Sequence, residues 1–163
     1  MQNNRFKFRV WDKDKNRFSN CINNELRLGC EGILTLPLTK SDTYIIQQFT
    51  GLKDSEGKDI YEGDILERSY TRSDGKKEQI YYNYYEVLFY CGEFEINGSE
   101  YSIGVNGFCA KMIKTTNKES SSYIGRILPL ANEIKVENCG AFGFNAAEMK
   151  TICHIFDDKN LLK

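Results

Sequence analysis

Apolar and charged side chains alternate along much of this chain, and that alternation limits its fold more than any other feature. Near the amino terminus, apolar residues at positions 6, 8 and 10 alternate with Arg5, Lys7 and Arg9. A strand presents successive residues to opposite faces, whereas a helix repeats about every 3.6 residues. Helical spacing of apolar residues is rare in this sequence. The pattern therefore predicts a mainly β protein.

Turn-forming residues divide the alternating segments into hairpins. Asp12 to Asn16 (DKDKN) predicts an N-terminal β-hairpin, because Asp and Asn bond their own backbone and tolerate left-handed backbone angles. Lys53 to Lys58 (KDSEGK) predicts a second turn, capped by Asp54. Asp74-Gly75 lies in a charged loop and predicts a long hairpin between the strands on either side.

The aromatic segment from Ile80 to Val105 predicts further strand pairing. Asn97-Gly98 is the strongest two-residue hairpin signal in the chain. If these two residues form the turn, Phe94 faces Tyr101, and this aromatic pair stabilises the two strands by up to about 1 kcal/mol. Cys91-Gly92 allows one more turn before it.

Length and composition fit a single domain. A chain of 163 residues buries about two-thirds of its unfolded surface, and its 40% hydrophobic content is enough for a core. Asn145 followed by Glu148 is a capping-box pattern that predicts a brief helix, Ala146 to Thr151. We expect one mainly β domain with one or two short helices.

Neither a targeting segment nor a cysteine–histidine metal-binding motif is evident. The basic start is followed by no apolar stretch, and the longest apolar run is far shorter than the roughly 20 residues of a membrane span. The six cysteines form no CxxC pair, and His154 is the single histidine. We therefore expect a cytoplasmic protein with reduced thiols, no cofactor and no membrane association.

Three segments together resemble the YopX family, whose members occur mostly in bacteriophages and prophages. Arg5 to Phe18 (RFKFRVWDKDKNRF) is similar to the opening strand and lysine-rich turn of the family. Gln48 to Leu66 (QFTGLKDSEGKDIYEGDIL) carries the most specific motif. Lys150 to Leu162 (KTICHIFDDKNLL) is a weaker match to the closing strand. The motif positions, which we expect to be structural, are Trp11, Asp12, Thr50, Gly51, Leu52, Asp54, Gly57, Tyr61, Gly63 and Asp64.

The resemblance implies a mainly β fold with a small SH3-like barrel and a phage or prophage origin. It implies one YopX-like domain over residues 1–163, with a hairpin and an irregular segment over 1–47 and a barrel-like body over 48–163. The family supplies no biochemical function. No catalytic, cofactor-binding or metal-binding residue is therefore carried over to this chain.

The formal net charge of −1 conceals two opposed segments. Six basic residues against Asp12 and Asp14 give the N-terminal segment +4, and Arg5, Lys7, Arg9 and Trp11 are its candidate contacts with a partner or with nucleic acid. Residues 80–101 hold four acids and no lysine or arginine, a net −4. Three of these acids form a candidate face for a basic partner: Glu93, Glu95 and Glu100.

Other residue patterns allow chemistry, and each has a structural alternative. Asp54, Glu62 and Asp64 could line a divalent-metal site, but turn capping by the two aspartates also explains the neighbouring glycines. His154 follows Cys153 directly, and neighbours in a strand point to opposite faces, which argues against a catalytic pair.

Five tyrosines between positions 81 and 90 could form a stacking surface for single-stranded nucleic acid, although the acidic local charge argues against it. The leading hypothesis is a non-enzymatic phage accessory protein that binds a protein partner or itself through β surfaces. The alternatives are a small nucleic-acid-binding β-barrel that uses the basic N-terminal strand, and a divalent-metal-dependent hydrolase.

Overall fold

The computed structural model describes residues 7–19, 27–28, 34–35, 43–75, 77–95, 102–131 and 144–154. Contacts along the chain separate two compact units, Met1–Phe49 and Thr50–Lys163. The boundary falls inside strand β5 (Tyr44–Lys53). Arg5, Glu100 and the Asn97-Gly98 pair lie outside the described residues.

The first unit contains the predicted N-terminal hairpin. Strand β1 (Phe8–Asp12) pairs antiparallel with β2 (Arg17–Phe18) and with the first part of β5. The turn between β1 and β2 is held by Asp12, whose Oδ1 accepts hydrogen bonds from the backbone N–H groups of Asp14 and Lys15. Two further short strands, β3 (Arg27–Leu28) and β4 (Leu34–Thr35), pair with each other. The predicted N-terminal hairpin, formed by β1 and β2 around the turn at Asp12, is thus confirmed.

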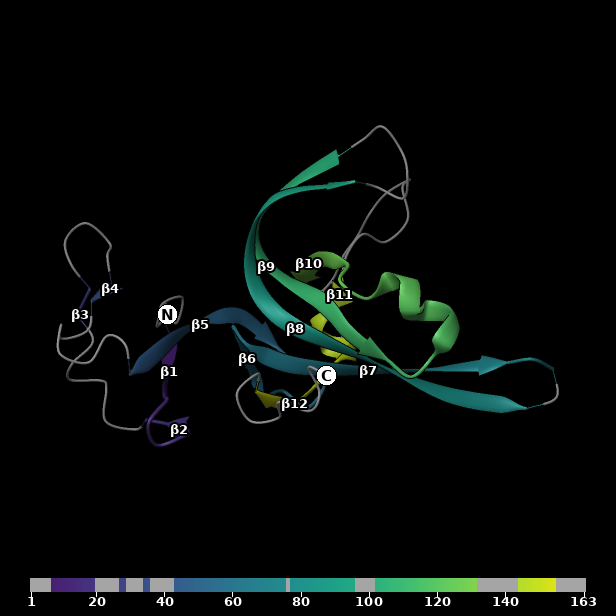
Figure 1. Cartoon of the computed structure of the whole chain (residues 1–163), viewed down its shortest axis with the longest axis horizontal. Helices are drawn as coiled ribbons and strands as arrows, with labels where there is room; N and C mark the ends of the chain where they lie inside the picture. Colours follow the sequence, from purple (N-terminus) through teal and green to yellow (C-terminus); the bar gives the residue numbers. More distant parts are fainter. Residues whose placement is uncertain are drawn as a thin grey trace. The chain divides into compact units, whose positions relative to one another are not determined.

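The second unit is built around a six-stranded sheet, in which the strands follow the order β11-β10-β9-β8-β7-β12. The six strands are β7 (Asp64–Ser73), β8 (Glu78–Glu95), β9 (Ser102–Thr115), β10 (Ile127–Ala131), β11 (Phe144–Asn145) and β12 (Lys150–His154). The short strand β6 (Asp59–Tyr61) precedes them in the chain and pairs with β5. The long strands β8 and β9 curl strongly, like part of a barrel wall (Figure 1). The mainly β prediction is confirmed.

Two short 3-10 helices accompany the sheet, η3 (Lys118–Tyr123) and η4 (Ala146–Glu148). The predicted cap is present at η4, where the Asn145 side chain accepts from the N–H of Ala147, but Glu148 accepts from the Asn145 side-chain amide and not from the backbone N–H as in a capping box. The helix is shorter than predicted, because the chain enters β12 at Lys150. Within the described residues, neither helix has the length or apolarity needed to cross a membrane.

The hydrophobic core lies on the inner face of the curled sheet. Antiparallel register places Leu66, Tyr85 and Met112 side by side on adjacent strands, and Val87 beside Ala110. These side chains are at most 6% exposed. The core is completed by Ile60, Leu130, Ala146 and Met149. Burial of each large aliphatic side chain stabilises the fold by about 1.5–3 kcal/mol.

Two expectations for the aromatic segment are wrong. Cys91 and Gly92 do not form a turn, because β8 continues through both to Glu95. Gly92 instead leaves room on the strand for the ring of Tyr90, whose Oη would lie 2.6 Å from an added Cβ. The register also differs, since Phe94 pairs with Ile103 rather than with Tyr101.

Candidate functional site

The most specific motif segment forms a turn that ties distant parts of the second unit together. Asp54 is 5% exposed, and its Oδ1 accepts from the N–H groups of Glu56 and Lys58, each at 2.9 Å. Its Oδ2 accepts from the N–H of Thr151 at 2.9 Å, across 97 residues of sequence. Burial opposes ionisation of the carboxyl group, but these N–H donors outweigh burial and lower the pKa of Asp54. The carboxylate thus holds both the turn and the start of β12.

The second half of the motif forms another carboxylate-held turn. Asp64 is 1% exposed, and its Oδ2 accepts from the N–H of Tyr61 at 2.8 Å. Gly63 between them has φ 76°, in the left-handed region that glycine adopts without strain. Its N–H donates to the carbonyl oxygen of Val87 and so extends the β7–β8 ladder by one bond. Turn chemistry accounts for both motif aspartates.

The geometry gives no support to a metal centre at this motif. The carboxylate oxygens of Asp54 and the Oδ2 of Asp64 accept backbone hydrogen bonds, so the groups expected to bind a cation already hold the chain. In the part of the chain that the structure describes, no three metal-ligating side chains cluster. Lys150 Nζ forms an ion pair with Glu56 at 2.7 Å on the surface of the same turn.

The basic N-terminal strand uses most of its candidate contact residues in packing. Trp11 is 3% exposed, and its ring meets Phe18 edge-on with centroids 5.0 Å apart. The Arg9 guanidinium lies 4.4 Å from the Phe18 ring centroid, and its Nε donates to Gln47 at 3.0 Å. Lys7 is exposed, with Nζ 5.5 Å from the Phe49 ring centroid. Of these three side chains, only Lys7 is exposed.

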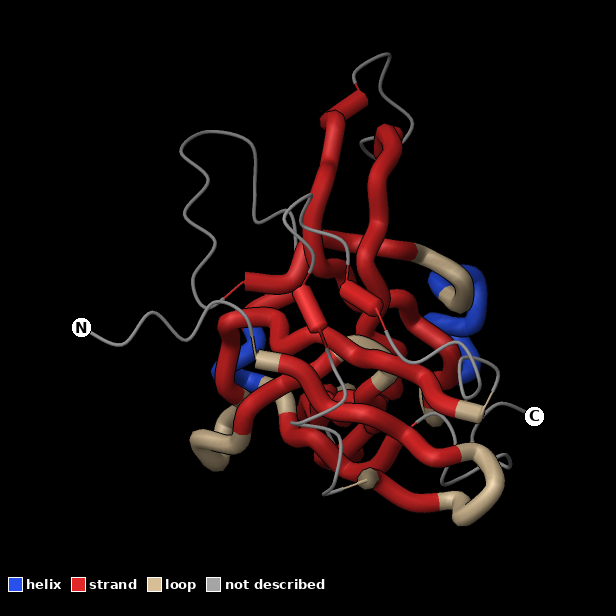
Figure 2. The backbone as a smooth tube through the Cα atoms, turned by 90° about the vertical axis from the view of Figure 1, so that its left-hand side faces the viewer, coloured by secondary structure: helices blue, strands red, loops and turns tan. Residues whose placement is uncertain are grey.

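The far ends of β8 and β9 form a two-stranded ribbon, here called the distal ribbon (Leu88–Glu95 and Ser102–Phe108). Pairing of β7 with β8 ends at Glu86, and β10 pairs with β9 only from Cys109 onwards. Within the described residues, both long edges of this ribbon therefore lack a strand partner. The ribbon leaves the rest of the sheet as a separate pair of strands (Figure 2).

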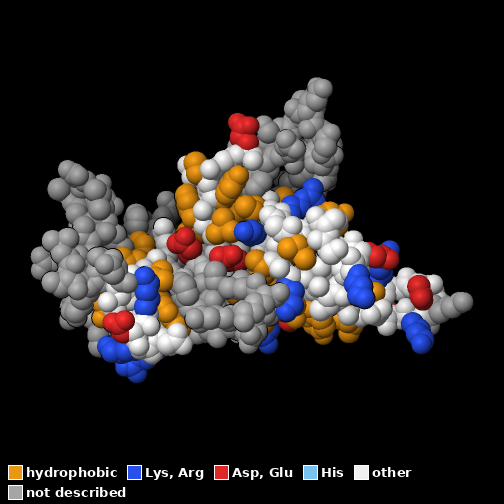
Figure 3. Space-filling model, in the orientation of Figure 1, with side chains coloured by type: hydrophobic (Ala, Val, Ile, Leu, Met, Phe, Trp, Pro, Cys, Tyr) orange, Lys and Arg blue, Asp and Glu red, His pale blue; other side chains and the backbone are white. Residues whose placement is uncertain are grey.

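Hydrophobic side chains gather on the distal ribbon (Figure 3). Phe89 is 51% exposed and packs edge-on against Phe108, with ring centroids 5.4 Å apart. Exposed Glu93 lies on the same side of β8, because it follows Phe89 by an even number of residues. Glu95 pairs with Ser102, so the expected position of Glu95 opposite Glu100 is wrong. The ribbon combines apolar surface, open edges and acidic charge.

The tyrosines of β8 divide between the two sides of the sheet. Tyr85 is 2% exposed in the core, whereas Tyr81 stacks on Tyr70 at 5.6 Å. Tyr82 and Tyr84 point the other way, and Tyr82 is 36% exposed. Of these four tyrosines, only Tyr82 and Tyr84 can therefore meet a ligand on the opposite face of the sheet, and the fifth tyrosine of the strand, Tyr90, falls on the same side further along.

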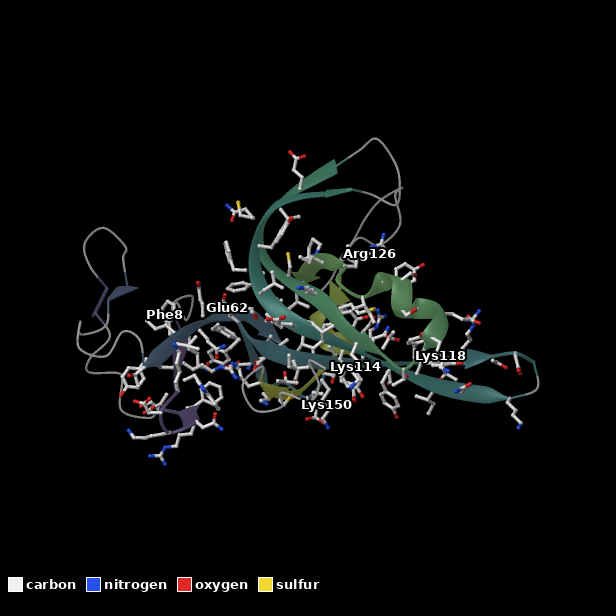
Figure 4. All side chains as sticks on the ribbon, viewed as in Figure 1. Phe8, Glu62, Lys114, Lys118, Arg126 and Lys150 are labelled. Atoms are coloured by element: carbon white, nitrogen blue, oxygen red, sulfur yellow. The ribbon has the colours of Figure 1, made fainter. Side chains whose placement is uncertain are left out.

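Neighbouring strands bring lysines to these two tyrosines. Register pairs Lys150 with Glu67, Glu67 with Tyr84, and Tyr84 with Lys114, in one row across four strands. Lys114 lies on β9 and Lys150 on β12, with β7 and β8 between them (Figure 4). We call this row, together with Tyr82, the outer sheet face. The sequence pattern pointed to the tyrosines but not to the two lysines, because Lys114 and Lys150 lie far from Tyr84 in the chain.

The acids of the outer sheet face are less exposed than its lysines. Burial, then the charge of Glu67 and a hydrogen bond to it, raise the pKa of Tyr84. Burial also raises the pKa of the half-buried Glu86, although Lys111 beside it acts in the opposite direction. Lys114 and Lys150 are both exposed. Solvent on this face therefore meets the Lys114 and Lys150 amines more than the Glu67 and Glu86 carboxylates, and Lys150 is paired with exposed Glu56.

Among the described residues, Cys109, Cys153 and His154 are not arranged for nucleophilic chemistry. Cys109 is fully buried, and burial raises the pKa of its thiol to about 11. On β12, Cys153 is opposite Ile65 and His154 is opposite Asp64, so the two neighbours face different sides of the sheet, as predicted. His154 is 2% exposed, which makes it a buried residue of the strand.

Comparison with known proteins assigns the chain to a family. No curated protein matches the chain in sequence. The crystal structure of protein EF1440 from Enterococcus faecalis is similar to it, with 18% identity, 96% of this chain and 97% of that chain covered, and a TM-score of 0.41. That similarity is too low to carry an argument. The family model described as YopX protein matches residues 7–128, more than half of the chain and including the Asp54 and Asp64 turns. The chain belongs to the YopX family.

Proposed function

We propose that this chain is a non-enzymatic accessory protein that acts by binding protein, and foremost a second copy of itself, through the distal ribbon. The supporting observation is the ribbon itself, where Phe89 is 51% exposed and the described residues provide no third strand. An isolated two-stranded ribbon is at best marginally stable in water. A partner that adds a strand or covers the apolar face would stabilise it.

Charge favours a second copy as the partner. The ribbon carries exposed Glu93 within a segment of net charge −4, whereas the turn after β1 exposes Lys13, Lys15 and Arg17. Both surfaces belong to the same chain, so one copy can offer its basic turn to the acidic ribbon of another. Such complementary patches favour head-to-tail association and weaken as salt is added.

The groups best suited to chemistry support the non-enzymatic part of the proposal. Asp12, Asp54 and Asp64 are each at most 5% exposed and accept backbone hydrogen bonds. The Cys109 thiol is buried with a raised pKa, which disfavours the reactive thiolate. These side chains serve the fold, so binding rather than catalysis is the simplest activity for the surface that remains.

The proposed setting is the cytoplasm of a bacterium that carries a phage or prophage. Family membership supports the phage context. Cys91 and Cys109 are free thiols, which fits a reducing compartment.

Light scattering coupled to size-exclusion chromatography tests self-association. We expect a mass above the 18.8 kDa of one chain at low salt, and a return toward one chain as protein is diluted or salt is raised. Phe89→Glu should give a monomer, whereas Ile124→Glu, which changes a side chain of similar exposure (49%), should not. A wild-type protein that stays monomeric at high concentration and low salt would refute self-association.

A further inference from the structure

We propose that the outer sheet face binds single-stranded nucleic acid, with bases stacked on Tyr82 and Tyr84 and phosphates held by Lys114 and Lys150. This surface is separate from the distal ribbon, so the inference stands whether or not the chain associates with itself. Its first support is the position of the two tyrosines. They are alternate residues on one face of a central strand, about 7 Å apart along it, and so offer two successive stacking positions.

The second support is the charge that the sheet assembles around these rings. Lys114 is the cross-strand neighbour of Tyr84 on β9, and Lys150 lies two strands away on β12. Phosphate contacts by such flanking amines supply most of the affinity of sequence-independent binding, while aromatic stacking tolerates any base. Lys150 also pairs with Glu56, but exposed ion pairs are weak enough to exchange for phosphate.

Two of the four acids that argued against nucleic-acid binding by the tyrosine segment, Glu86 and Glu93, are not exposed beside the two rings. Glu93 belongs to the distal ribbon and to the opposite side of β8. Glu86 does share the face of Tyr84, but it is half-buried beside Lys111. Glu67 is half-buried as well, and after burial its charge is the next cause of the raised pKa of Tyr84. The net charge of −4 along the sequence therefore does not describe this surface.

Single strands fit this face better than a duplex. Stacking on a tyrosine requires an exposed base face, which a duplex keeps inside its stack. The backbone around the rings is itself fixed, since the N–H of Tyr82 donates to Thr116 Oγ1 at 2.8 Å. A rigid sheet that presents aromatic rings needs little rearrangement to accept a flexible strand.

Fluorescence anisotropy with labelled oligothymidylate and oligouridylate tests the proposal. We expect both to bind at about 50 mM salt and to weaken steeply by about 200 mM salt. Tyr82→Ala should weaken binding about tenfold or more, the loss of one stacked base. Lys114→Gln and Lys150→Gln should each lower the slope of log affinity against log salt by about 0.7. A preference between the two oligonucleotides would identify DNA or RNA as the ligand.

Matched variants separate this face from the rest of the surface. Tyr123→Ala removes a tyrosine that is 48% exposed on η3, and it should leave binding unchanged. Lys7→Gln and Lys13→Gln change the basic N-terminal unit and should also have little effect. Loss of binding in those two variants, with Tyr82→Ala unaffected, would overturn the proposal in favour of the basic strand. Absence of oligonucleotide binding at about 50 mM salt would overturn it too, and would leave exposed Tyr82 and Ile80 as a protein contact.

Discussion

The two halves of strand β8 carry similar alternating sequences in different surroundings. In the proximal half, Tyr85 and Val87 point into the core and are 2% and 1% exposed. In the distal half, Phe89 continues the same side of the strand and is 51% exposed. The proximal half lies between β7 and β9 and is covered by residues such as Met149, whereas the distal half pairs with β9 alone.

This difference shows that alternation specifies which side a residue takes but not whether that side is covered. Coverage comes from elements far away in the sequence. Ile60 of β6 and Met149, which follows η4, close the proximal half, and the described residues provide no equivalent over Phe89. An apolar residue on an uncovered ribbon is available for binding, whereas the same kind of residue in the core stabilises the fold.

Thiol reactivity should separate the two regions most strongly. Cys91 on the distal ribbon is exposed, whereas Cys109 is fully buried with a thiol pKa raised to about 11. We expect iodoacetamide near neutral pH to alkylate Cys91 at least about a thousandfold faster, since Cys109 must wait for opening of the fold. Peptide mapping by mass spectrometry measures both rates in one sample. Equal rates would mean that the proximal sheet is not closed.

Truncation of a side chain in each half should give unequal losses of stability. Tyr85→Ala should lower the free energy of unfolding by about 3–5 kcal/mol, because it leaves a cavity in the core. Phe89→Ala should cost less than about 1 kcal/mol, the usual range for an exposed position. Urea unfolding of both variants, monitored by circular dichroism at low protein concentration, makes the comparison. A large loss for Phe89→Ala in a monomeric sample would show that the ribbon is covered within one chain.

The buried turn held by Asp54 and the exposed turn held by Asp74 should also lose unequal amounts of unfolding free energy when the aspartate is replaced. The difference should be smaller than that between Tyr85→Ala and Phe89→Ala. Asp54→Asn removes a buried carboxylate that accepts three backbone hydrogen bonds and should cost about 1–3 kcal/mol. Asp74→Asn changes the exposed turn of the β7–β8 hairpin, where Oδ1 accepts from Lys77, and should cost less than about 0.5 kcal/mol. Chemical denaturation at neutral pH measures both losses.

Lowering the pH should reduce the difference in free energy of unfolding between the wild-type protein and the Asp54→Asn variant. The pKa of Asp54 in the folded chain is lowered from 3.8, so its ionised form binds protons less readily when folded than when unfolded. Its contribution is therefore complete above about pH 4 and is lost as the pH falls through the lowered value. Repeating the denaturation series at acid pH checks this direction. A difference that stays constant across the series would show that the charge of the carboxylate is not what stabilises the turn.

Local sequence signals predicted the elements that depend on neighbouring residues. The hairpin turn at Asp12, the turn at Asp54 and the cap at Asn145 were all predictable, because each is held by a short polar side chain that bonds the nearby backbone. The hydrogen bond from the N–H of Thr151 to Asp54 was not predictable from this pattern, since no local signal in either segment indicates that the two segments meet.

Two predictions made from turn residues were wrong, because the curvature and register of the sheet decide the pairing there. Asn97-Gly98 predicted a pairing of Phe94 with Tyr101, but Phe94 pairs with Ile103. The Cys91-Gly92 pair predicts a turn, but Gly92 accommodates the Tyr90 ring within a continuous strand. In a long curled hairpin, pairing along the whole ladder decides the register, so one turn dipeptide does not.

The sequence by itself determined the β class, the family and the side of the strand that each β8 residue takes, because alternation and turn chemistry act over a few neighbouring residues. Tertiary structure decided which of those sides are covered and what lies next to them. Pairing between β12, β7, β8 and β9 places Lys114 beside Tyr84 and Lys150 in the same row two strands away, while Phe89 stays exposed on the same strand as buried Tyr85. Burial and cross-strand proximity depend on contacts between segments far apart in the chain, and local sequence patterns carry no information about those contacts.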